Sequence, residues 1–207
     1  MGPCRTRISE FRLRIEITGP IASGKSTLAR VLASLPGWTL AREVPEAVPF
    51  WAETYNGERS YQLEKDMGFL LFHALHIREA QSRSGERLIC DFSFLQDLAY
   101  AELGQDPGEL IAYQMVHDHL SKIHGKPALI INLHCPTPVL LARIRQRGRQ
   151  PEQGISADFL DSLRDRTDTH LARGAVPLVE IDSEAMDFRR PAKDVLRMVL
   201  PLLPLAV

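Results

Sequence analysis

Residues 19–26 read Gly-Pro-Ile-Ala-Ser-Gly-Lys-Ser, which fits the phosphate-binding loop pattern G-x-x-x-x-G-K-[ST] without a mismatch. The preceding stretch, Leu13–Thr18, alternates apolar and polar residues as a strand does, and residues 27–33 are helix formers with apolar residues about one turn apart. A strand, a glycine loop and a helix N-terminus form a cradle whose backbone N–H groups point at phosphate oxygens. The segment therefore predicts a site for a nucleoside triphosphate. The residues predicted to contact it are Gly19, Pro20, Ile21, Ala22, Ser23, Gly24, Lys25, Ser26 and Thr27.

Two side chains of this loop have distinct expected roles. Lys25 would reach the β- and γ-phosphates, and the Ser26 hydroxyl would ligate Mg²⁺. An apolar strand that ends in an acidic residue opposite such a loop often completes the Mg²⁺ shell, and residues 88–90 lead directly into Asp91. Ser26 and Asp91 are therefore the predicted metal ligands. The alternative for Asp91 is a helix N-cap or a turn residue.

The rest of the chain alternates predicted strands with predicted helices. Apolar runs indicate further strands at residues 38–41, 87–90, 128–134 and 178–181. Helical periodicity or composition indicates helices at residues 61–82, 95–102, 107–124, 138–147, 157–172 and 193–203. This alternation predicts an α/β fold with a five-stranded parallel sheet covered by helices on both faces. Ligands of such sheets bind beyond the carboxyl ends of the strands.

Composition limits the class of protein. A chain of 207 residues with 44% hydrophobic residues supports one core, so we expect a single domain over residues 1–207. The net charge of -1 gives no argument for a nucleic-acid partner, and no window is apolar enough to predict a membrane span. The cysteines Cys4, Cys90 and Cys135 are far apart and lack metal-ligand spacing. We expect reduced thiols and a cytoplasmic location.

A glutamate and an arginine-rich segment are further candidates for chemistry. Glu46 lies between Pro45 and Pro49, and a carboxylate held there could take a proton from an attacking hydroxyl. The alternative is a surface glutamate. Residues 143–149 contain four arginines, and the local charge stays positive until Glu152. Such a segment can neutralise the charge that spreads over the γ-phosphate during transfer, so we predict a lid at about residues 143–155. The alternative is a surface basic patch.

With these pieces placed, the chain resembles the deoxynucleoside kinase family over nearly its whole length. Residues 19–27 match the family's G-x-I-x-S-G-K-S-T loop, and residues 45–51 resemble its P-E-P-V-x-x-W segment. Residues 143–149 match R-I-x-x-R-G-R, and residues 152–155 match the E-Q-G-I that follows it. Asp187 and Phe188, which follow the last strand, look like the family's adenine-contacting loop. The resemblance implies a P-loop kinase fold, a homodimer in nucleoside salvage, ATP with Mg²⁺, and transfer of the γ-phosphate to the 5′-hydroxyl of a nucleoside or deoxynucleoside.

The resemblance also implies roles for individual side chains. Glu46 falls on the general base, while Tyr55 and Glu152 would bind the 3′-hydroxyl of a deoxyribose. The implied catalytic residues are Glu46, Lys25, Arg143, Arg147 and Arg149. The implied substrate-binding residues are Glu46, Trp51, Tyr55, Asp66, His73, Phe92, Asp97 and Glu152.

The chain departs from the family pattern at the acceptor site. The family's E/D-R-S/T motif stands here as Asp91-Phe92-Ser93, and a phenyl ring supplies neither the charge nor the donors of an arginine. The base-reading Gln and Arg of the family fall on Asp66 and His73. An ionised Asp66 only accepts hydrogen bonds, so it would favour bases that present N–H donors, or a ligand other than a base. If Asp66 and Asp97 face one pocket, they would repel each other or recruit a protonated His73.

Two other functions fit parts of the sequence. One is a P-loop kinase for another small acceptor, such as a nucleoside monophosphate or a metabolite; the loss of an arginine at Phe92 argues against a monophosphate. The other is a catalytically weakened, nucleotide-binding regulatory protein. The chain contains no N-K-x-D motif of the kind that guanine-nucleotide switches carry.

Overall fold

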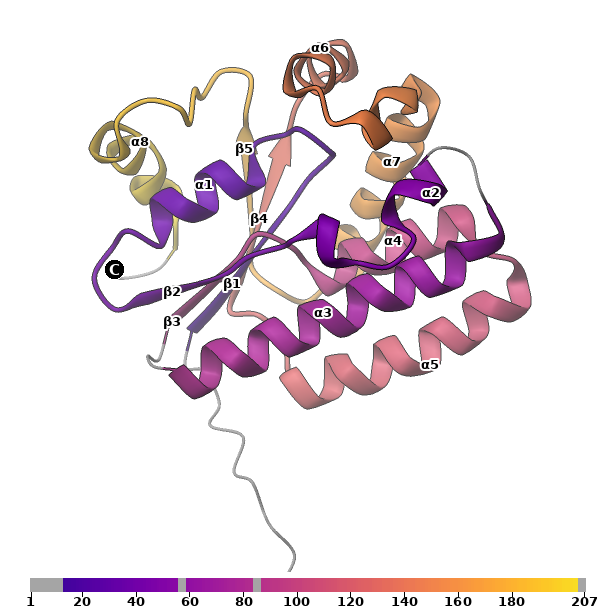
Figure 1. Ribbon diagram of the computed structural model, residues 1–207. Coiled ribbons are helices and arrows are strands. Elements are labelled where there is room, and N and C mark those ends of the chain that lie inside the picture. Colours follow the sequence, from indigo (N-terminus) through magenta and orange to yellow (C-terminus); the bar gives the residue numbers. More distant parts are fainter. Residues whose placement is uncertain (1–12, 56–58, 84–86, 205–207) are drawn as a thin grey trace, which may run out of the picture.

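The computed structural model describes residues 13–55, 59–83 and 87–204, and its centre is a five-stranded parallel sheet. The strand order is β2-β3-β1-β4-β5 (Figure 1). The strands are β1 (Leu13–Thr18), β2 (Trp38–Ala41), β3 (Arg87–Cys90), β4 (Leu129–His134) and β5 (Leu178–Asp182). Because all neighbouring strands pair in parallel, their carboxyl ends lie at one edge of the sheet.

Helices cover both faces of this sheet, as Figure 1 shows: α1 and α8 lie on one side, and α3 and α5 lie side by side on the other. The helices are α1 (Lys25–Leu32), α2 (Trp51–Tyr55), α3 (Gln62–Arg83), α4 (Phe94–Gly104), α5 (Pro107–His124), α6 (Thr137–Arg147), α7 (Ala157–Arg173) and α8 (Ala192–Val199). Short 3₁₀ turns occur at Pro45–Ala47, Arg59–Tyr61, Gln150–Gly154 and Leu200–Leu202. The predicted three-layer α/β fold is confirmed.

Strand β1 is buried more completely than its alternating sequence suggests. It lies between β3 and β4, and Ile15 pairs with Ile89 on one side and Leu129 on the other. Its polar residues are buried as well: Arg14 forms an ion pair with Glu16 at 3.0 Å. The Arg14 guanidinium also donates to two backbone carbonyls at the end of α5, so its charge is compensated inside the protein.

The predicted strand boundaries agree with the structure to within one residue. The last predicted helix, residues 193–203, is shorter than expected: α8 ends at Val199 and continues as a 3₁₀ turn that contains Pro201. Proline has no N–H to continue the helical hydrogen bonds, which accounts for the change. Cys90 and Cys135 are buried and free, as expected, whereas Cys4 lies outside the described residues. Within the described ranges, no helix is long and apolar enough to cross a membrane.

Candidate active site

Most of the predicted site residues line a cavity of about 660 Å³. It receives side chains from the phosphate-binding loop, α2, α3, α4, the lid and the segment after β5. Predicted residues that line it are Ile21, Ala22, Ser23, Gly24, Lys25, Ser26, Thr27, Trp51, Tyr55, Asp66, Phe92, Asp97, Arg143, Arg147, Arg149, Glu152, Asp187 and Phe188. Among the described residues, five predicted site residues are not part of its wall: Gly19, Pro20, Glu46, His73 and Asp91.

The phosphate-binding loop wraps between β1 and α1 with a backbone that favours glycine. Gly19 has φ +137°, and a Cβ there would stand 2.7 Å from the carbonyl oxygen of Leu133. Gly24 has φ +106° directly before α1, and a Cβ there would approach the ring of Phe188 to 3.1 Å. Phe188 therefore packs against the loop, and the cavity-lining Asp187 precedes it.

Lys25 folds back over this loop. Its Nζ donates to the backbone carbonyl oxygens of Gly19 at 2.7 Å and Pro20 at 3.1 Å. Burial lowers the pKa of Lys25, while the nearby Glu43 and Asp91 carboxylates act in the opposite direction. The ammonium is thus held beside two acidic groups at the start of α1.

Asp91 has a buried oxygen that suits a metal ion. Its side chain is 1% exposed, and Oδ1 accepts a hydrogen bond from the backbone N–H of Glu43. Oδ2 has no hydrogen-bond partner within the part of the chain that the structure describes. Burial raises the pKa of Asp91, and the nearby Ser26 hydroxyl favours the ionised form. A carboxylate oxygen left open beside the phosphate loop fits Mg²⁺, which usually takes one or two carboxylates plus phosphate oxygens and water.

Two glutamates three residues apart follow β2, and they face different surroundings. Glu43 lines the cavity, with its side chain 29% exposed. Burial alone would raise the pKa of Glu43, but His73 and Lys25 outweigh it and hold that pKa below its usual range. Glu46, the predicted general base, lies in the 3₁₀ turn Pro45–Ala47, is 52% exposed, and pairs with Arg149 at 3.2 Å. The two carboxylates are therefore not interchangeable.

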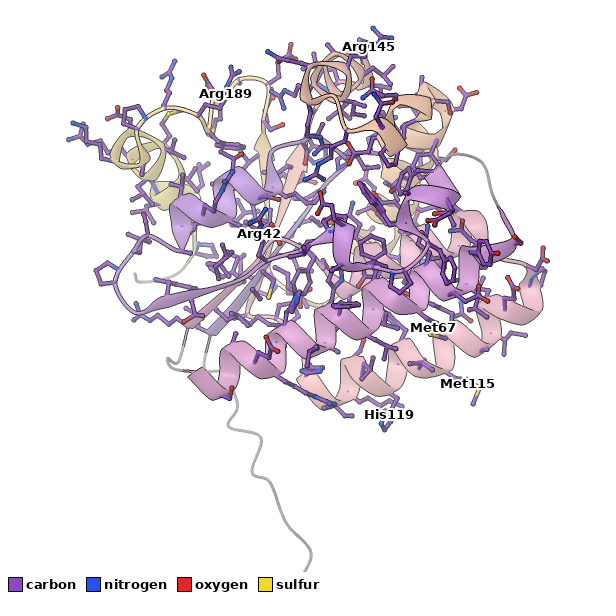
Figure 2. The ribbon with its side chains drawn as sticks, in the orientation of Figure 1. Arg42, Met67, Met115, His119, Arg145 and Arg189 are labelled. Atoms are coloured by element: carbon purple, nitrogen blue, oxygen red, sulfur yellow. The ribbon has the colours of Figure 1, made fainter. Side chains whose placement is uncertain are left out.

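The predicted lid arginines have distinct partners. The guanidinium of Arg143 donates to the carbonyl oxygen of Ser183 at 2.8 Å and approaches the phosphate-loop carbonyls of Ala22 and Ser23 at 3.4 and 3.5 Å. Arg147 and Arg149 both pair with Glu152, which is 4% exposed. Arg145 points away from the body of the protein on the outer side of α6 (Figure 2).

The α2–α3 side of the cavity carries two aromatic side chains that the sequence indicated and one lysine that it did not. Trp51 and Tyr55 line it, and burial raises the pKa of Tyr55. Lys65, which the sequence analysis missed, is 5% exposed and lies 5.7 Å from the ring of Tyr55 and 6.0 Å from that of Tyr100.

Asp66 lines the cavity, but protein donors already engage it. Its Oδ1 pairs with Lys65 at 2.9 Å, and its Oδ2 accepts from Gln62 at 3.0 Å and Gln105 at 2.9 Å. The sequence analysis treated Asp66 as a free acceptor for a base. Gln105 is 39 residues away in the chain, so local sequence could not reveal this arrangement.

His73 lies behind the cavity wall rather than in it. It is 1% exposed, and its ring stacks on Phe92 with centroids 3.9 Å apart and planes 2° apart. Its Nδ1 is 2.8 Å from Oδ2 of Asp97, and its Nε2 is 3.5 Å from Oε1 of Glu43. Burial by itself would lower the pKa of His73, but Asp97 and Glu43 together raise it to about 10.

Comparisons with known proteins identify the family of this chain. The family description "Deoxynucleoside kinase" matches residues 15–202. The chain is 32% identical over 161 residues to a deoxyadenosine kinase of Lactobacillus acidophilus, covering 73% of each chain. It is 29% identical over 152 residues to a deoxyguanosine kinase of Bacillus subtilis, covering 72% of this chain and 73% of that protein. The chain therefore belongs to the deoxynucleoside kinase family.

Solved structures show the same fold at lower identity. A deoxyadenosine kinase from M. mycoides, solved with dCMP and a flexible dCDP, superposes with a TM-score of 0.77 at 18% identity; the match covers 91% of this chain and all of that one. The same kinase with dCTP gives a TM-score of 0.74 at 17% identity. Family membership makes this chain a phosphotransferase that uses ATP to phosphorylate deoxynucleosides. It does not support the two alternative functions that the sequence left open.

Proposed function

We propose that the cavity is the phosphoryl-transfer site and that the phosphate-binding loop holds the ATP phosphates within it. Lys25 and the loop N–H groups would contact the β- and γ-phosphates, and Arg143 would stabilise the loop from the lid side. Arg147 and Arg149 would exchange their pairing with Glu152 for contacts to the transferring phosphoryl group. Asp187 and Phe188 would border the adenine. Catalysis would then depend on positioning and on neutralising negative charge.

We assign the general base to Glu43 rather than to Glu46. The observation that carries this assignment is the place of Glu43 in the cavity wall, where its backbone N–H binds Asp91 and its carboxylate faces His73. Its depressed pKa keeps the carboxylate ionised and able to accept a proton from the 5′-hydroxyl of the acceptor. Glu46, half exposed and paired with Arg149, would instead hold the lid.

The test compares Glu43→Gln with Glu46→Gln in a coupled ATP-consumption assay. Both substitutions remove one carboxylate and keep the side-chain volume. Loss of a general base lowers kcat by about 10²- to 10⁴-fold, and we expect this in Glu43→Gln only. In Glu46→Gln we expect a change of a few fold. A large loss of kcat in Glu46→Gln, with Glu43→Gln near wild type, would restore the assignment made from the sequence.

We propose Mg²⁺ as the metal, held by the Asp91 carboxylate and the Ser26 hydroxyl. The unpartnered Oδ2 of Asp91 supports this assignment. When bound, the ion would neutralise phosphate charge during transfer. Asp91→Asn should raise the Mg²⁺ concentration needed for half-maximal activity by tenfold or more, and an unchanged Mg²⁺ dependence would argue against the assignment.

We propose that the acceptor is a purine deoxynucleoside, because the two relatives with the matches reported above are named for deoxyadenosine and deoxyguanosine. Tyr55 and Glu152 would bind the 3′-hydroxyl, and Trp51 and Phe92 would border the base. Both oxygens of Asp66 are engaged by protein donors. The Lys65 ammonium has further N–H donors beyond its ion pair with Asp66, and Asp97 has a second oxygen beyond the one that faces His73, so these two side chains would supply a donor and an acceptor toward the base. Turnover measured with each natural nucleoside and deoxynucleoside tests this, and a preference for pyrimidines would contradict it.

We also propose a homodimer formed through α3 and α5. Leu71 and Leu75 on α3 are 53% and 46% exposed, and Ile111 and Met115 on α5 are 62% and 71% exposed. Each pair is four residues apart, so each forms a stripe along its helix, and Met115 projects outward beside His119 (Figure 2). Sedimentation should give a dimer for the wild type and a monomer for the double variant Ile111→Asp with Met115→Asp. A monomeric wild type at micromolar concentration would refute the dimer.

Two broader expectations complete the proposal. Residues 1–207 would act as one kinase domain with a lid at about residues 143–155, and nucleic acid would not be a partner. The buried free thiols of Cys90 and Cys135 fit a reducing, cytoplasmic location.

A further inference from the structure

His73 connects two acidic side chains that come from different parts of the fold. It projects from α3 and lies between Asp97 on α4 and Glu43, which follows β2. The contact to Asp97 is a hydrogen bond at 2.8 Å, whereas Nε2 lies 3.5 Å from Oε1 of Glu43, which is ion-pair distance. Within the described residues Nε2 has no hydrogen-bond partner, so the Glu43 carboxylate is the group placed to receive its N–H. The imidazole of His73 therefore lies between the carboxylates of Asp97 and Glu43, and a different ring nitrogen faces each of them.

The position of His73 is fixed from its flat side as well. Phe92 stacks on the ring at 3.9 Å with an interplanar angle of 2°, and Phe69, one turn earlier on α3, lies 5.9 Å away. The ring is 1% exposed, and Phe92, which covers it, is 2% exposed and lines the cavity. A side chain so enclosed cannot contact an acceptor in the cavity directly. It can act only through the groups that it holds.

We propose that His73 is a positioning residue for phosphoryl transfer: anchored by Asp97, it holds the carboxylate of Glu43 in the orientation that faces the acceptor hydroxyl. This rests on the proposed role of Glu43 as general base. The arrangement explains how the site keeps a cation beside the base although Phe92 occupies the position of the family arginine. The imidazole of His73 lies behind the phenyl ring of Phe92, and it approaches the carboxylate of Glu43 from the α3 side.

This role differs from the one that the sequence implied for His73, which was to read the base of the nucleoside. A residue that reads the base changes KM and the order of preference among nucleosides when it is altered. A residue that orients Glu43 changes kcat, because a misplaced base reduces the fraction of bound substrate in the reactive geometry. The two roles are therefore separable by kinetics.

Two substitutions distinguish the two nitrogens of the ring. The amide nitrogen of Asn lies close to where Nδ1 of His lies, and the amide nitrogen of Gln extends to about where Nε2 lies. His73→Asn thus keeps a donor toward Asp97 and loses the one toward Glu43, while His73→Gln keeps a donor that can reach Glu43. Both variants are neutral, polar and smaller than or similar to histidine in volume, so each serves as the control for the other.

The experiment measures kcat and KM for the best deoxynucleoside acceptor in both variants, alongside ATP binding and thermal unfolding. We expect kcat to fall by about 10- to 100-fold in His73→Asn and by only a few fold in His73→Gln, with KM for the acceptor nearly unchanged in both. Equal kcat values in the two variants, a lower kcat in His73→Gln, or a loss confined to KM would overturn the proposal.

Glu43→Gln, measured in parallel, separates the inference from the function on which it rests. If Glu43→Gln keeps its kcat, the assignment of the base is wrong. If Glu43→Gln loses kcat but the two His73 variants do not differ from each other, the base assignment stands and the positioning role fails. In the double variant Glu43→Gln with His73→Asn, the two losses should not multiply, because His73 acts through Glu43.

Discussion

The charge of His73 should make the stability of the protein fall as the pH rises above neutrality. Asp97 and Glu43 raise the pKa of His73 to about 10, whereas an unfolded chain has the ordinary value of about 6.5. A raised pKa contributes stability that is complete below pH 6.5 and is lost as the pH rises toward 10. In this window the unfolded state releases a proton that the folded state keeps. The free energy of unfolding therefore falls as the pH rises.

The size of the effect follows from the number of protons involved. One proton per molecule corresponds to about 1.4 kcal/mol per pH unit, so His73 should remove about 2 kcal/mol between pH 7 and 8.5. His124, whose pKa burial lowers to about 4, titrates below this range. The buried tyrosines Tyr55, Tyr100 and Tyr113 have raised pKa values and stay neutral within it.

Urea unfolding at several pH values between 7 and 8.5 measures this loss, and His73→Gln is the control that lacks the titrating group. The difference in slope between wild type and variant isolates His73 from all other groups. In proton NMR, one imidazole signal absent from the variant should also remain that of a protonated ring throughout the range. The reasoning is refuted if the two proteins show the same pH dependence, or if the imidazole signal that is absent from the variant titrates near pH 6.5.

Three further substitutions test other parts of the structure. Gly24→Ala should lower the free energy of unfolding by about 1–2 kcal/mol and raise KM for ATP, because Gly24 has φ +106° and a Cβ there meets the ring of Phe188 at 3.1 Å. An unchanged thermal midpoint would contradict this. Ile17→Ala should lower the free energy of unfolding by about 2–5 kcal/mol, because Ile17 is fully buried in the central strand; a urea titration measures it. Phe92→Arg should lower the free energy of unfolding by about 3 kcal/mol and should also lower activity, because it buries a second cation against His73. A rise in kcat would contradict this and would mean that Phe92 impairs the wild-type enzyme.

The local motifs of the sequence were sufficient to predict the fold and the donor side of the site. The octapeptide at residues 19–26 requires a strand before it and a helix after it, because only that arrangement directs backbone N–H groups at a phosphate. The apolar runs then identified all five strands, since strands buried on both faces carry hydrophobic residues with few interruptions. These features depend on neighbours within a few residues, which a sequence displays directly.

The acceptor side depended on contacts between distant residues. Glu43 and Glu46 are both acidic and near Pro45, and the local pattern favoured Glu46 because it lies between Pro45 and Pro49. Only the folded chain turns Glu43 toward the cavity, while the 3₁₀ turn at Pro45–Ala47 presents Glu46 to solvent and to Arg149.

The same reason explains Asp66 and His73. Asp66 appeared free in the sequence, but Gln105 from the segment between α4 and α5 helps to saturate it. His73 appeared to face a nucleoside base, but Phe92 covers its ring. Its Nδ1 binds Asp97, and its Nε2 faces the carboxylate of Glu43. The sequence determined which residue types are present and where the strands and helices begin. The tertiary structure decided which polar groups are already paired, because hydrogen-bond partners are brought together by packing and not by order in the chain.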